Sequence, residues 1–233
     1  YMNVLPQAAD PGKLIKEMRA GGADAILTTM GIASMYAYEI GSMALILRID
    51  GSGSHLDRSM RFDQRFTVEN AVRLGAEAVA VMGFPGVNDD ETLKTVAHVA
   101  SQCDEWNMPL LAEMMAGGFD PSFHTPENTT ISARIGAELG ADIIKTTYTG
   151  DTESFSNLTA GVFCPVVVLG GGKKDDVQEL LQMVYDAIQA GAAGVAVGRN
   201  VWQHENVRGV VSALAAIIHE DATVEQALTK LNA

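Results

Sequence analysis

The stretch Leu139-Gly-Ala-Asp-Ile-Ile-Lys-Thr-Thr-Tyr148 joins the end of a helical pattern to a short apolar run typical of a buried β-strand. Its opening phrase recurs before other apolar runs, as Ala20-Gly-Gly-Ala-Asp24, Leu74-Gly-Ala-Glu77 and Ala190-Gly-Ala-Ala193. In each copy a glycine can take the left-handed conformation that ends a helix, and a strand then begins. The repeated phrase therefore predicts strands that alternate with helices along the chain.

This alternation predicts seven strands and six helices. The expected strands are Ala25–Thr29, Ala44–Asp50, Ala78–Phe84, Leu110–Met114, Asp142–Tyr148, Val166–Gly170 and Gly194–Gly198. The expected helices are Pro11–Ala20, Val68–Leu74, Asp90–Trp106, Thr130–Leu139, Lys174–Ala190 and Asn206–His219. Because the strands are nearly continuous apolar runs separated by helices, they indicate a parallel sheet covered by helices.

The regular spacing favours an α/β fold of the (β/α)8, or TIM-barrel, type that is one strand short of closure. We expect the first strand to lie upstream of Tyr1, so that residues 1–233 form a single barrel domain that is incomplete at its N-terminus. An open doubly wound sheet is the alternative that the strand count also allows. A polar insertion after the second expected strand, Gly51–Arg65, has a length typical of a lid.

Composition limits the partners of the chain. Of its 233 residues 47% are apolar and 19% are charged, which suits one compact domain. The sequence shows no long apolar span or secretory leader pattern, and its net charge of −13 disfavours nucleic acid and anionic membranes. A small anionic ligand stays possible, since it needs only a local group of N–H donors and cations. Two cysteines, Cys103 and Cys164, predict buried, reduced thiols and a cytoplasmic location.

Lys145 is the only lysine that falls within an expected strand. Successive strand residues face opposite sides, so Lys145 shares a side with Ile143 and Thr147. If that side is the barrel interior, burial lowers the lysine pKa from about 10.4 and favours a neutral amine. Such an amine can attack a carbonyl and form an iminium ion, which accepts electrons when the adjacent C–C bond breaks. An outward-facing or ion-paired lysine is the structural alternative.

Two glycine-rich turns follow the last two expected strands and indicate a phosphate site. The first is Gly170-Gly-Gly-Lys-Lys174, and the second is Gly198-Arg-Asn200. Glycines allow the backbone to approach an anion, and a following helix start adds N–H donors. Arg199 can donate two hydrogen bonds to phosphate, and Lys173 or Lys174 adds a positive charge. Turns need glycine for other reasons, so the interpretation depends on having two such turns, each with a cation.

Acidic residues near strand ends are candidates for proton transfer. Glu113 closely follows the apolar pair Leu110-Leu111, and Asp50 ends its expected strand. The alternative for each is a carboxylate that faces a loop or caps a helix. His55 and Asp57 have no third ligand at a recognisable spacing, so we expect no metal.

Three motifs in this order resemble the class I aldolases of the archaeal-type fructose-bisphosphate aldolase and deoxyribose-phosphate aldolase-like family. They are Gly140-Ala-Asp-Ile-Ile-Lys-Thr-Thr-Tyr-Thr-Gly-Asp151, Gly170-Gly-Gly-Lys-Lys174 and Gly198-Arg-Asn-Val-Trp-Gln203. The resemblance implies a TIM barrel, a homo-oligomer and catalysis through a covalent lysine, with no metal or other cofactor. It matches Lys145 to the Schiff-base lysine. It places phosphate at Gly171, Gly172, Lys173, Gly198 and Arg199.

Two departures from the family pattern affect what it implies about substrate. The family's Asp-His-Gly segment on its first strand would fall just before Tyr1. The tyrosine of its Tyr-Pro-Arg-Gly motif is replaced by Met115, in the stretch Glu113-Met-Met-Ala-Gly-Gly118. Proton transfer then falls to Glu113, to the upstream aspartate or to water.

The resemblance implies a lyase or transferase that acts on a phosphorylated ketose, with fructose 1,6-bisphosphate as the family's usual substrate. Two other family members are alternatives: 2-amino-3,7-dideoxy-D-threo-hept-6-ulosonate synthase, a transaldolase, and a thiolase acting on a phosphorylated diketone. The thiolase also lacks the tyrosine and shares the Gly-Gly-Lys-Lys turn. From other classes, a barrel isomerase that uses Lys145 only for proton transfer and a non-catalytic phosphosugar-binding barrel stay open.

Overall fold

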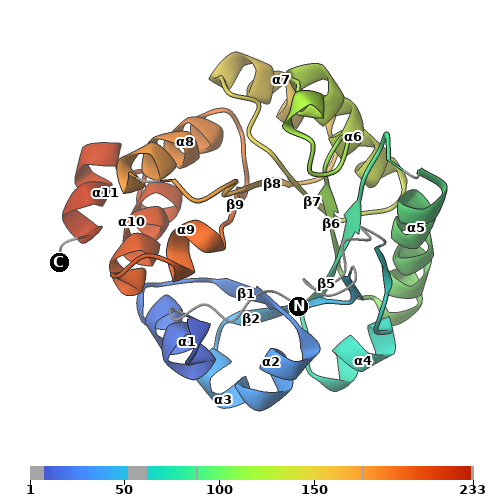
Figure 1. Ribbon diagram of the computed structural model, residues 1–233, viewed down its shortest axis with the longest axis horizontal. Helices are drawn as coiled ribbons and strands as arrows, with labels where there is room; N and C mark the ends of the chain where they lie inside the picture. Colours follow the sequence, from blue (N-terminus) through green and yellow to red (C-terminus); the bar gives the residue numbers. More distant parts are fainter. Residues whose placement is uncertain (1–7, 52–61, 88, 175, 232–233) are drawn as a thin grey trace.

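The computed structural model describes residues 8–51, 62–87, 89–174 and 176–231, and in them seven parallel strands form one sheet. The strands are β1 (Ala25–Thr28), β2 (Ala44–Arg48), β5 (Ala78–Gly83), β6 (Leu110–Met114), β7 (Ile143–Thr146), β8 (Val166–Leu169) and β9 (Gly194–Ala196). They pair in chain order, β1-β2-β5-β6-β7-β8-β9, without the reversal that a doubly wound sheet requires. Figure 1 shows them curving around a centre, with the longer helices outside. The barrel prediction is confirmed.

Six helices correspond to the expected ones. They are α1 (Pro11–Ala20), α4 (Val68–Arg73), α5 (Asp89–Trp106), α6 (Pro126–Glu138), α8 (Val177–Gln189) and α10 (Val207–His219). The remaining helices were not predicted: α2 (Met30–Met35), α3 (Ala37–Ile40), α7 (Thr152–Gly161), α9 (Arg199–Trp202), α11 (Val224–Leu231) and the 3-10 turn η2 (Pro121–Phe123). Most are too short for a clear 3.6-residue pattern, and α7 buries only Phe155 and Leu158. The exception is α11, which buries Val224, Ala227 and Leu231 at helical spacing, so a local periodic signal was present there.

The glycines of the repeated phrase end helices as predicted. Each has a positive φ between 72° and 99°, and they are Gly22, Gly75, Gly140 and Gly191. The expected strand Ala44–Asp50 divides in two, because β2 ends at Arg48 and β3 (Asp50–Gly51) turns to pair antiparallel with β4 (Asp63–Gln64). The proposed lid falls mainly on residues 52–61, which lie outside the described residues, as do His55 and Asp57. The strand expected upstream of Tyr1 stays a prediction.

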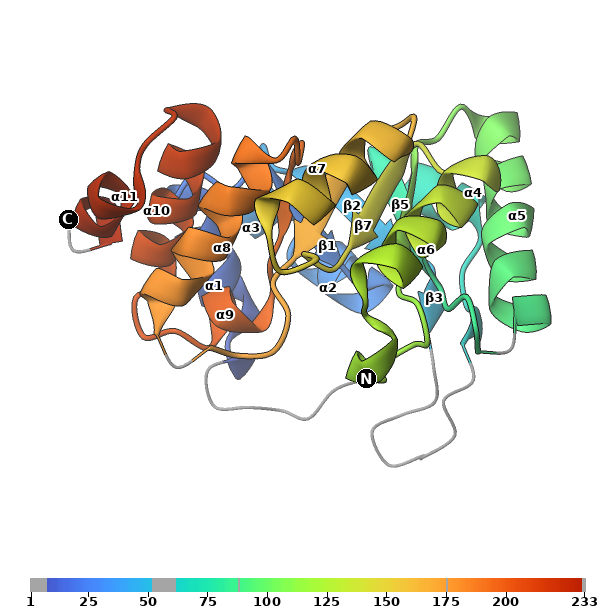
Figure 2. The ribbon, with the colours of Figure 1, turned by 90° about the horizontal axis from the view of Figure 1, so that it is seen from above.

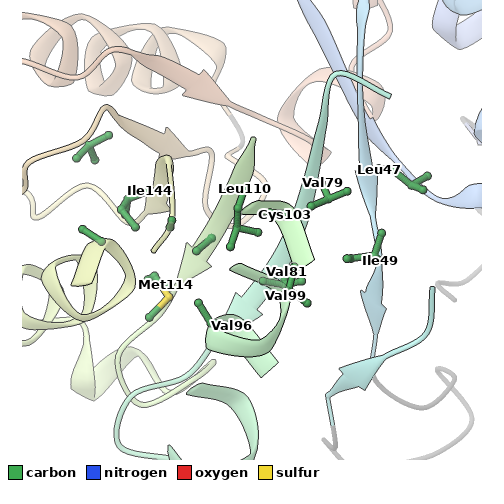
Figure 3. Close-up of a cluster of buried hydrophobic side chains, with 14 of the residues drawn as sticks. Leu47, Ile49, Val79, Val81, Val96, Val99, Cys103, Leu110, Met114 and Ile144 are labelled. Carbon is green, nitrogen blue, oxygen red and sulfur yellow. The ribbon is translucent and has the colours of Figure 1, made fainter. Parts of the chain in front are cut away.

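One face of the sheet packs against the helices and is therefore its outer face. The side chains at the alternate positions of each strand then point into the barrel. Leu47, Val79, Val81, Leu110, Met114 and Ile144 form one buried cluster with Val96, Val99 and Cys103 of α5 (Figure 3). Thr146 is also buried on this outer side, where its hydroxyl donates to the Met114 carbonyl at 2.9 Å. Since Ile144 and Thr146 face outwards, Lys145 between them faces the interior.

The carboxyl ends of the strands point to one edge of the molecule. Figure 2 shows α9 and β3, which follow β9 and β2, at this same edge.

Among the described helices, none has the length and apolarity needed to cross a membrane. Both cysteines are free, but only Cys103 is buried; Cys164 is partly exposed, so the prediction that both are buried is wrong. Cys164 lies in the turn before β8 rather than within the strand.

Candidate active site

A row of inward-facing side chains crosses the barrel at the level of Lys145. The register of the sheet pairs Met82 with Glu113, Glu113 with Lys145, and Lys145 with Val167. Directly paired residues of neighbouring strands point to the same face, with side chains about 5 Å apart. The fold therefore places Glu113 beside Lys145, although 31 residues separate them in the chain.

Four charged side chains form a connected network in this row. The Lys145 Nζ lies 3.0 Å from Oε1 of Glu113, and Arg48 donates through Nη2 to the other carboxylate oxygen of Glu113. Arg48 also donates to Asp50 at 3.2 Å, and Asp50 accepts the Met82 backbone N–H at 2.6 Å. Exposed fractions are small, at 12% for the Lys145 side chain, 11% for Glu113 and 1% for Asp50. Two cations and two carboxylates thus balance inside the barrel, as buried charges require.

Burial and neighbouring charges move the pKa values of the network in different directions. Burial lowers the pKa of Lys145, and Arg48 adds to this, although Glu113 works to raise it. For Glu113, burial works to raise the pKa, but Lys145 and Arg48 together outweigh it and lower the pKa of this carboxyl. Burial raises the pKa of Asp50 against the opposing effect of Arg48. Lys145 therefore reaches its neutral form more easily than an exposed lysine, next to a carboxylate that can exchange a proton with it.

Arg48 is a member of the site that sequence analysis missed. The signal was present, because Arg48 is a charge inside the apolar run Ala44-Leu-Ile-Leu-Arg48, much as Lys145 is in its own strand. Asp50, which sequence analysis named as a candidate acid, does not contact Lys145. It binds Arg48 and the backbone N–H of Met82 instead.

The two glycine turns meet at the carboxyl ends of β8 and β9. The side chain of Asn200, which is buried, donates to the carbonyls of Gly170 and Gly172 at 2.8 and 2.9 Å and accepts the Lys174 backbone N–H at 2.6 Å. Arg199 donates to the Gly171 carbonyl at 3.0 Å, and Gly171 has a φ of +67°. Asn200 was missed by sequence analysis because its role depends on a turn 26 to 30 residues away. The helix α9 after Gly198 has only four residues, so the expected contribution of a helix start is small.

The predicted phosphate residues lie together on the surface of this region. Gly171, Gly172, Lys173, Gly198 and Arg199 are exposed. In the described part of the chain, neither Lys173 nor Arg199 has an ion-pair partner, whereas Lys174 pairs with Glu179 at 3.4 Å. A cavity of about 590 Å³ is lined by the first turn and by Thr147, Tyr148 and Leu169. It thus connects the turn after β8 with the end of the Lys145 strand.

The arrangement can bind an anion at the turns and present an amine to a carbonyl deeper in the barrel. No group of three or more His, Cys, Asp or Glu side chains within the described ranges is placed to hold a metal ion.

Comparison with known proteins identifies the family. The model of the DeoC/LacD family aldolases matches residues 3–204. The 2-amino-3,7-dideoxy-D-threo-hept-6-ulosonate synthase of Halobacterium salinarum is 36% identical over 217 residues, which cover 93% of this chain and 82% of the relative. The chain belongs to the DeoC/LacD aldolase family. A second relative of this aldolase is the class 1 fructose-bisphosphate aldolase of Thermoproteus tenax, which is 34% identical, with 92% of this chain and 82% of the relative covered.

Solved structures agree with this membership. The aldolase matches an archaeal fructose 1,6-bisphosphate aldolase with a TM-score of 0.85 and 33% identity, over 92% of this chain and 86% of the other. It also matches, with a TM-score of 0.84 and 33% identity over 91% and 85% of the two chains, an archaeal aldolase whose catalytic lysine is covalently bound to the carbinolamine intermediate. The aldolase is a class I enzyme, which works through a Schiff base. Its relatives carry names with different substrates, so family membership alone does not name its own.

Proposed function

We propose that Lys145 is the Schiff-base nucleophile and that the aldolase makes or breaks a C–C bond in a phosphorylated ketose, most closely in a fructose-bisphosphate aldolase-like reaction. The observation that carries this proposal is an inward-facing lysine with a lowered pKa, 3.0 Å from a carboxylate, at the end of the barrel where the glycine turns meet. Two relatives above 30% identity, one of them named for fructose bisphosphate, support the substrate class.

In the cleavage direction, the neutral Lys145 amine adds to the ketone carbon, and the resulting carbinolamine loses water to form an iminium ion. A base removes the proton of the hydroxyl group on the second carbon from the iminium carbon, and the bond between that carbon and its neighbour next to the iminium carbon breaks. The electron pair of this C–C bond moves toward the iminium nitrogen to form an enamine, and the hydroxyl-bearing carbon leaves as an aldehyde. The enamine that stays on Lys145 takes up a proton, and water releases the ketone product and the free amine. The positive charge of the iminium ion takes the place of that of the ammonium ion beside Glu113, and Arg48 stays paired with Glu113 while the amine or the enamine is neutral.

Glu113 is the proton carrier in this proposal. Its Oε1 lies within hydrogen-bonding distance of the reacting nitrogen, which is the geometric requirement for a general acid or base. Arg48 occupies its other oxygen and keeps it ionised. Met115, where the family pattern has tyrosine, carries no proton to transfer. We infer that proton transfer therefore depends on Glu113.

The phosphate group binds at the two glycine turns. Gly171, Gly172 and Gly198 offer exposed backbone, and Lys173 and Arg199 offer cations without an ion-pair partner among the described residues. Gly171 and Gly172 have open space where a Cβ would stand, so an anion can approach the backbone closely. We expect no metal, because the iminium ion itself accepts the electrons. A homo-oligomer, a cytoplasmic location and a single barrel domain over residues 1–233 stay part of this proposal.

Borohydride trapping tests the proposed function. The protein is incubated with dihydroxyacetone phosphate and sodium borohydride, and the adduct is located by peptide mass spectrometry. The expected result is one reduced adduct on Lys145. An adduct on a different residue would refute the assignment of the nucleophile. Activity that survives reduction in the presence of substrate would indicate the barrel isomerase. Ligand binding without turnover, undiminished in Lys145→Ala, would indicate a phosphosugar-binding barrel.

A further inference from the structure

A second row of inward-facing side chains lies one step closer to the barrel mouth than Lys145, and it is mostly apolar. The ladder between β5 and β6 continues past the strands, since the Met115 N–H donates to the Gly83 carbonyl at 3.0 Å. With this register, Phe84 and Met115 follow Met82 and Glu113 on the inner face, and Thr147 and Leu169 are the matching positions after Lys145 and Val167. In this row Thr147 is the polar member.

These side chains pack into one cluster, which we call the apolar wall: Phe62, Met82, Phe84, Met115 and Leu169. Met82, Phe84 and Met115 are buried. The rings of Phe62 and Phe84 meet edge to face with centroids 4.8 Å apart, and Phe119 lies against Phe84 at 5.3 Å. The cluster is separate from the outer core between sheet and helices, because its members point into the barrel.

Met82, Phe84 and Met115 of the apolar wall lie on the side of Lys145 opposite to the first glycine turn, whereas Leu169 lies on β8 beside that turn. In the order of the sheet, β8 carries the phosphate turn, β7 carries Lys145, and β6 and β5 carry Met115, Met82 and Phe84. Leu169 belongs to the wall and also lines the cavity beside Gly171 and Gly172, so the two surfaces are continuous. For a ketone with its phosphate at the turns and its carbonyl carbon at Lys145, β6 and β5 are the next strands in the direction away from the turns.

Among the described residues, the charged groups of the Lys145 network on that side are already engaged. Glu113 is paired with Lys145 and Arg48, and Arg48 is also paired with Asp50. Hydroxyl groups projected onto Met82, Phe84 and Met115 would lose their hydrogen bonds to water without gaining new ones. Mutational data indicate a loss of about tenfold to a hundredfold for each polar group left unpaired in this way.

We propose that the half of the substrate that faces the apolar wall, released as the aldehyde in cleavage or added as the aldehyde in synthesis, is short and unhydroxylated. The inference rests on the proposed nucleophile and phosphorylated ketone, and it narrows the proposed function, because it disfavours a hydroxylated aldehyde such as the one that fructose 1,6-bisphosphate releases. The inference also gives Met115 a role. Because Met115 stands where the family has tyrosine, the apolar wall lacks a hydroxyl group at the place where it would meet the aldehyde. In the synthetic direction, the enamine carbon bonds to the aldehyde carbon, and the aldehyde oxygen takes up a proton.

The test compares two aldehydes with the same three-carbon chain, propanal and glyceraldehyde, as acceptors for dihydroxyacetone phosphate. The ratio of kcat/KM values is measured for the wild-type protein, and borohydride trapping with dihydroxyacetone phosphate alone is run beside it. We expect trapping at Lys145 and a preference for propanal of about tenfold or more. Trapping with equal rates, or with a preference for glyceraldehyde, would overturn this inference and leave the proposed function standing. Failure to trap would overturn both.

Variants assign the preference to the wall. Met115→Gln places an amide of similar size in the second row and should move the ratio toward glyceraldehyde, whereas Met115→Leu should leave it unchanged. Met108→Gln is the matched control, because Met108 has the same exposed fraction of 8% but precedes β6 at the opposite end of the strand. If Met115→Gln binds dihydroxyacetone phosphate covalently but keeps the wild-type ratio, the wall does not select the aldehyde and the inference is wrong.

Discussion

The two halves of the candidate site are built in different ways. Around Lys145, side chains from three strands and the β3 hairpin form a buried network whose members are fixed by the register of the sheet. At the glycine turns, exposed backbone and two cations are arranged by one buried amide, that of Asn200. Side chains on strands suit bond-making chemistry, which needs exact placement and low solvent access. Exposed backbone suits an anion that must enter and leave.

The largest expected effect comes from removing the amine at the centre of the buried half. Lys145→Met keeps a side chain of similar length but no nucleophile, so we expect a loss of about 10⁴-fold or more in kcat and no borohydride adduct. Aldol cleavage and trapping are measured together with circular dichroism. Lys94→Met, on the exposed surface of α5, is the control. If Lys145→Met keeps more than a tenth of wild-type activity, the buried half is not the catalytic half.

Glu113→Gln separates proton transfer from nucleophilic attack within the buried half. The amide keeps the shape of the side chain but cannot carry the proton, so kcat should fall by about 10² to 10³-fold. Trapping at Lys145 should still occur, more slowly. Glu138→Gln, which changes an exposed glutamate of α6, should behave like wild type. A Glu113→Gln enzyme with normal kcat would assign the proton to water or to another group.

Changes at the turns should affect binding rather than chemistry. Arg199→Gln removes a charged donor, so KM for a phosphorylated ketose should rise by about tenfold to a hundredfold with little change in kcat. For dihydroxyacetone, which has no phosphate, KM should be the same in this variant and in the wild type. Arg134→Gln on α6 is the matched surface control. An equal loss with both ketones would show that the turns serve the fold rather than the phosphate.

Arg48 lowers the pKa of Lys145, so its replacement should change mainly the pH dependence of kcat/KM. Arg48→Gln should raise that pKa. Attack needs the neutral amine, and therefore the acid limb of kcat/KM should move to higher pH, with a loss of several-fold at neutral pH. Arg48→Lys keeps the charge and should move the limb less. An unchanged limb in Arg48→Gln would mean that Arg48 only packs against Glu113.

Much of this architecture could be predicted because it follows local rules. The glycine that ends a helix and the apolar run after it predicted four of the seven sheet strands, β1, β5, β7 and β9, and apolar runs alone predicted the other three. The alternation of faces along β7 predicted that Lys145 shares a side with Ile143 and Thr147. The short helices α2, α3 and α9 were missed because four to six residues carry too little periodicity. Arg48 was missed for a different reason. Nothing near it in the chain shows that its partner is Glu113, 65 residues away.

By itself, the sequence determined the order of strands and helices, the residue types available for chemistry and the glycine turns, since these depend on spacing and on backbone preference. The tertiary structure decided which face of each strand is inside, because that depends on the packing of α5 and its neighbours against the outer face. It also decided that Lys145, Glu113 and Arg48 form one network and that Met115 joins an apolar wall. Those contacts depend on the register of strands far apart in the chain, which local sequence does not specify.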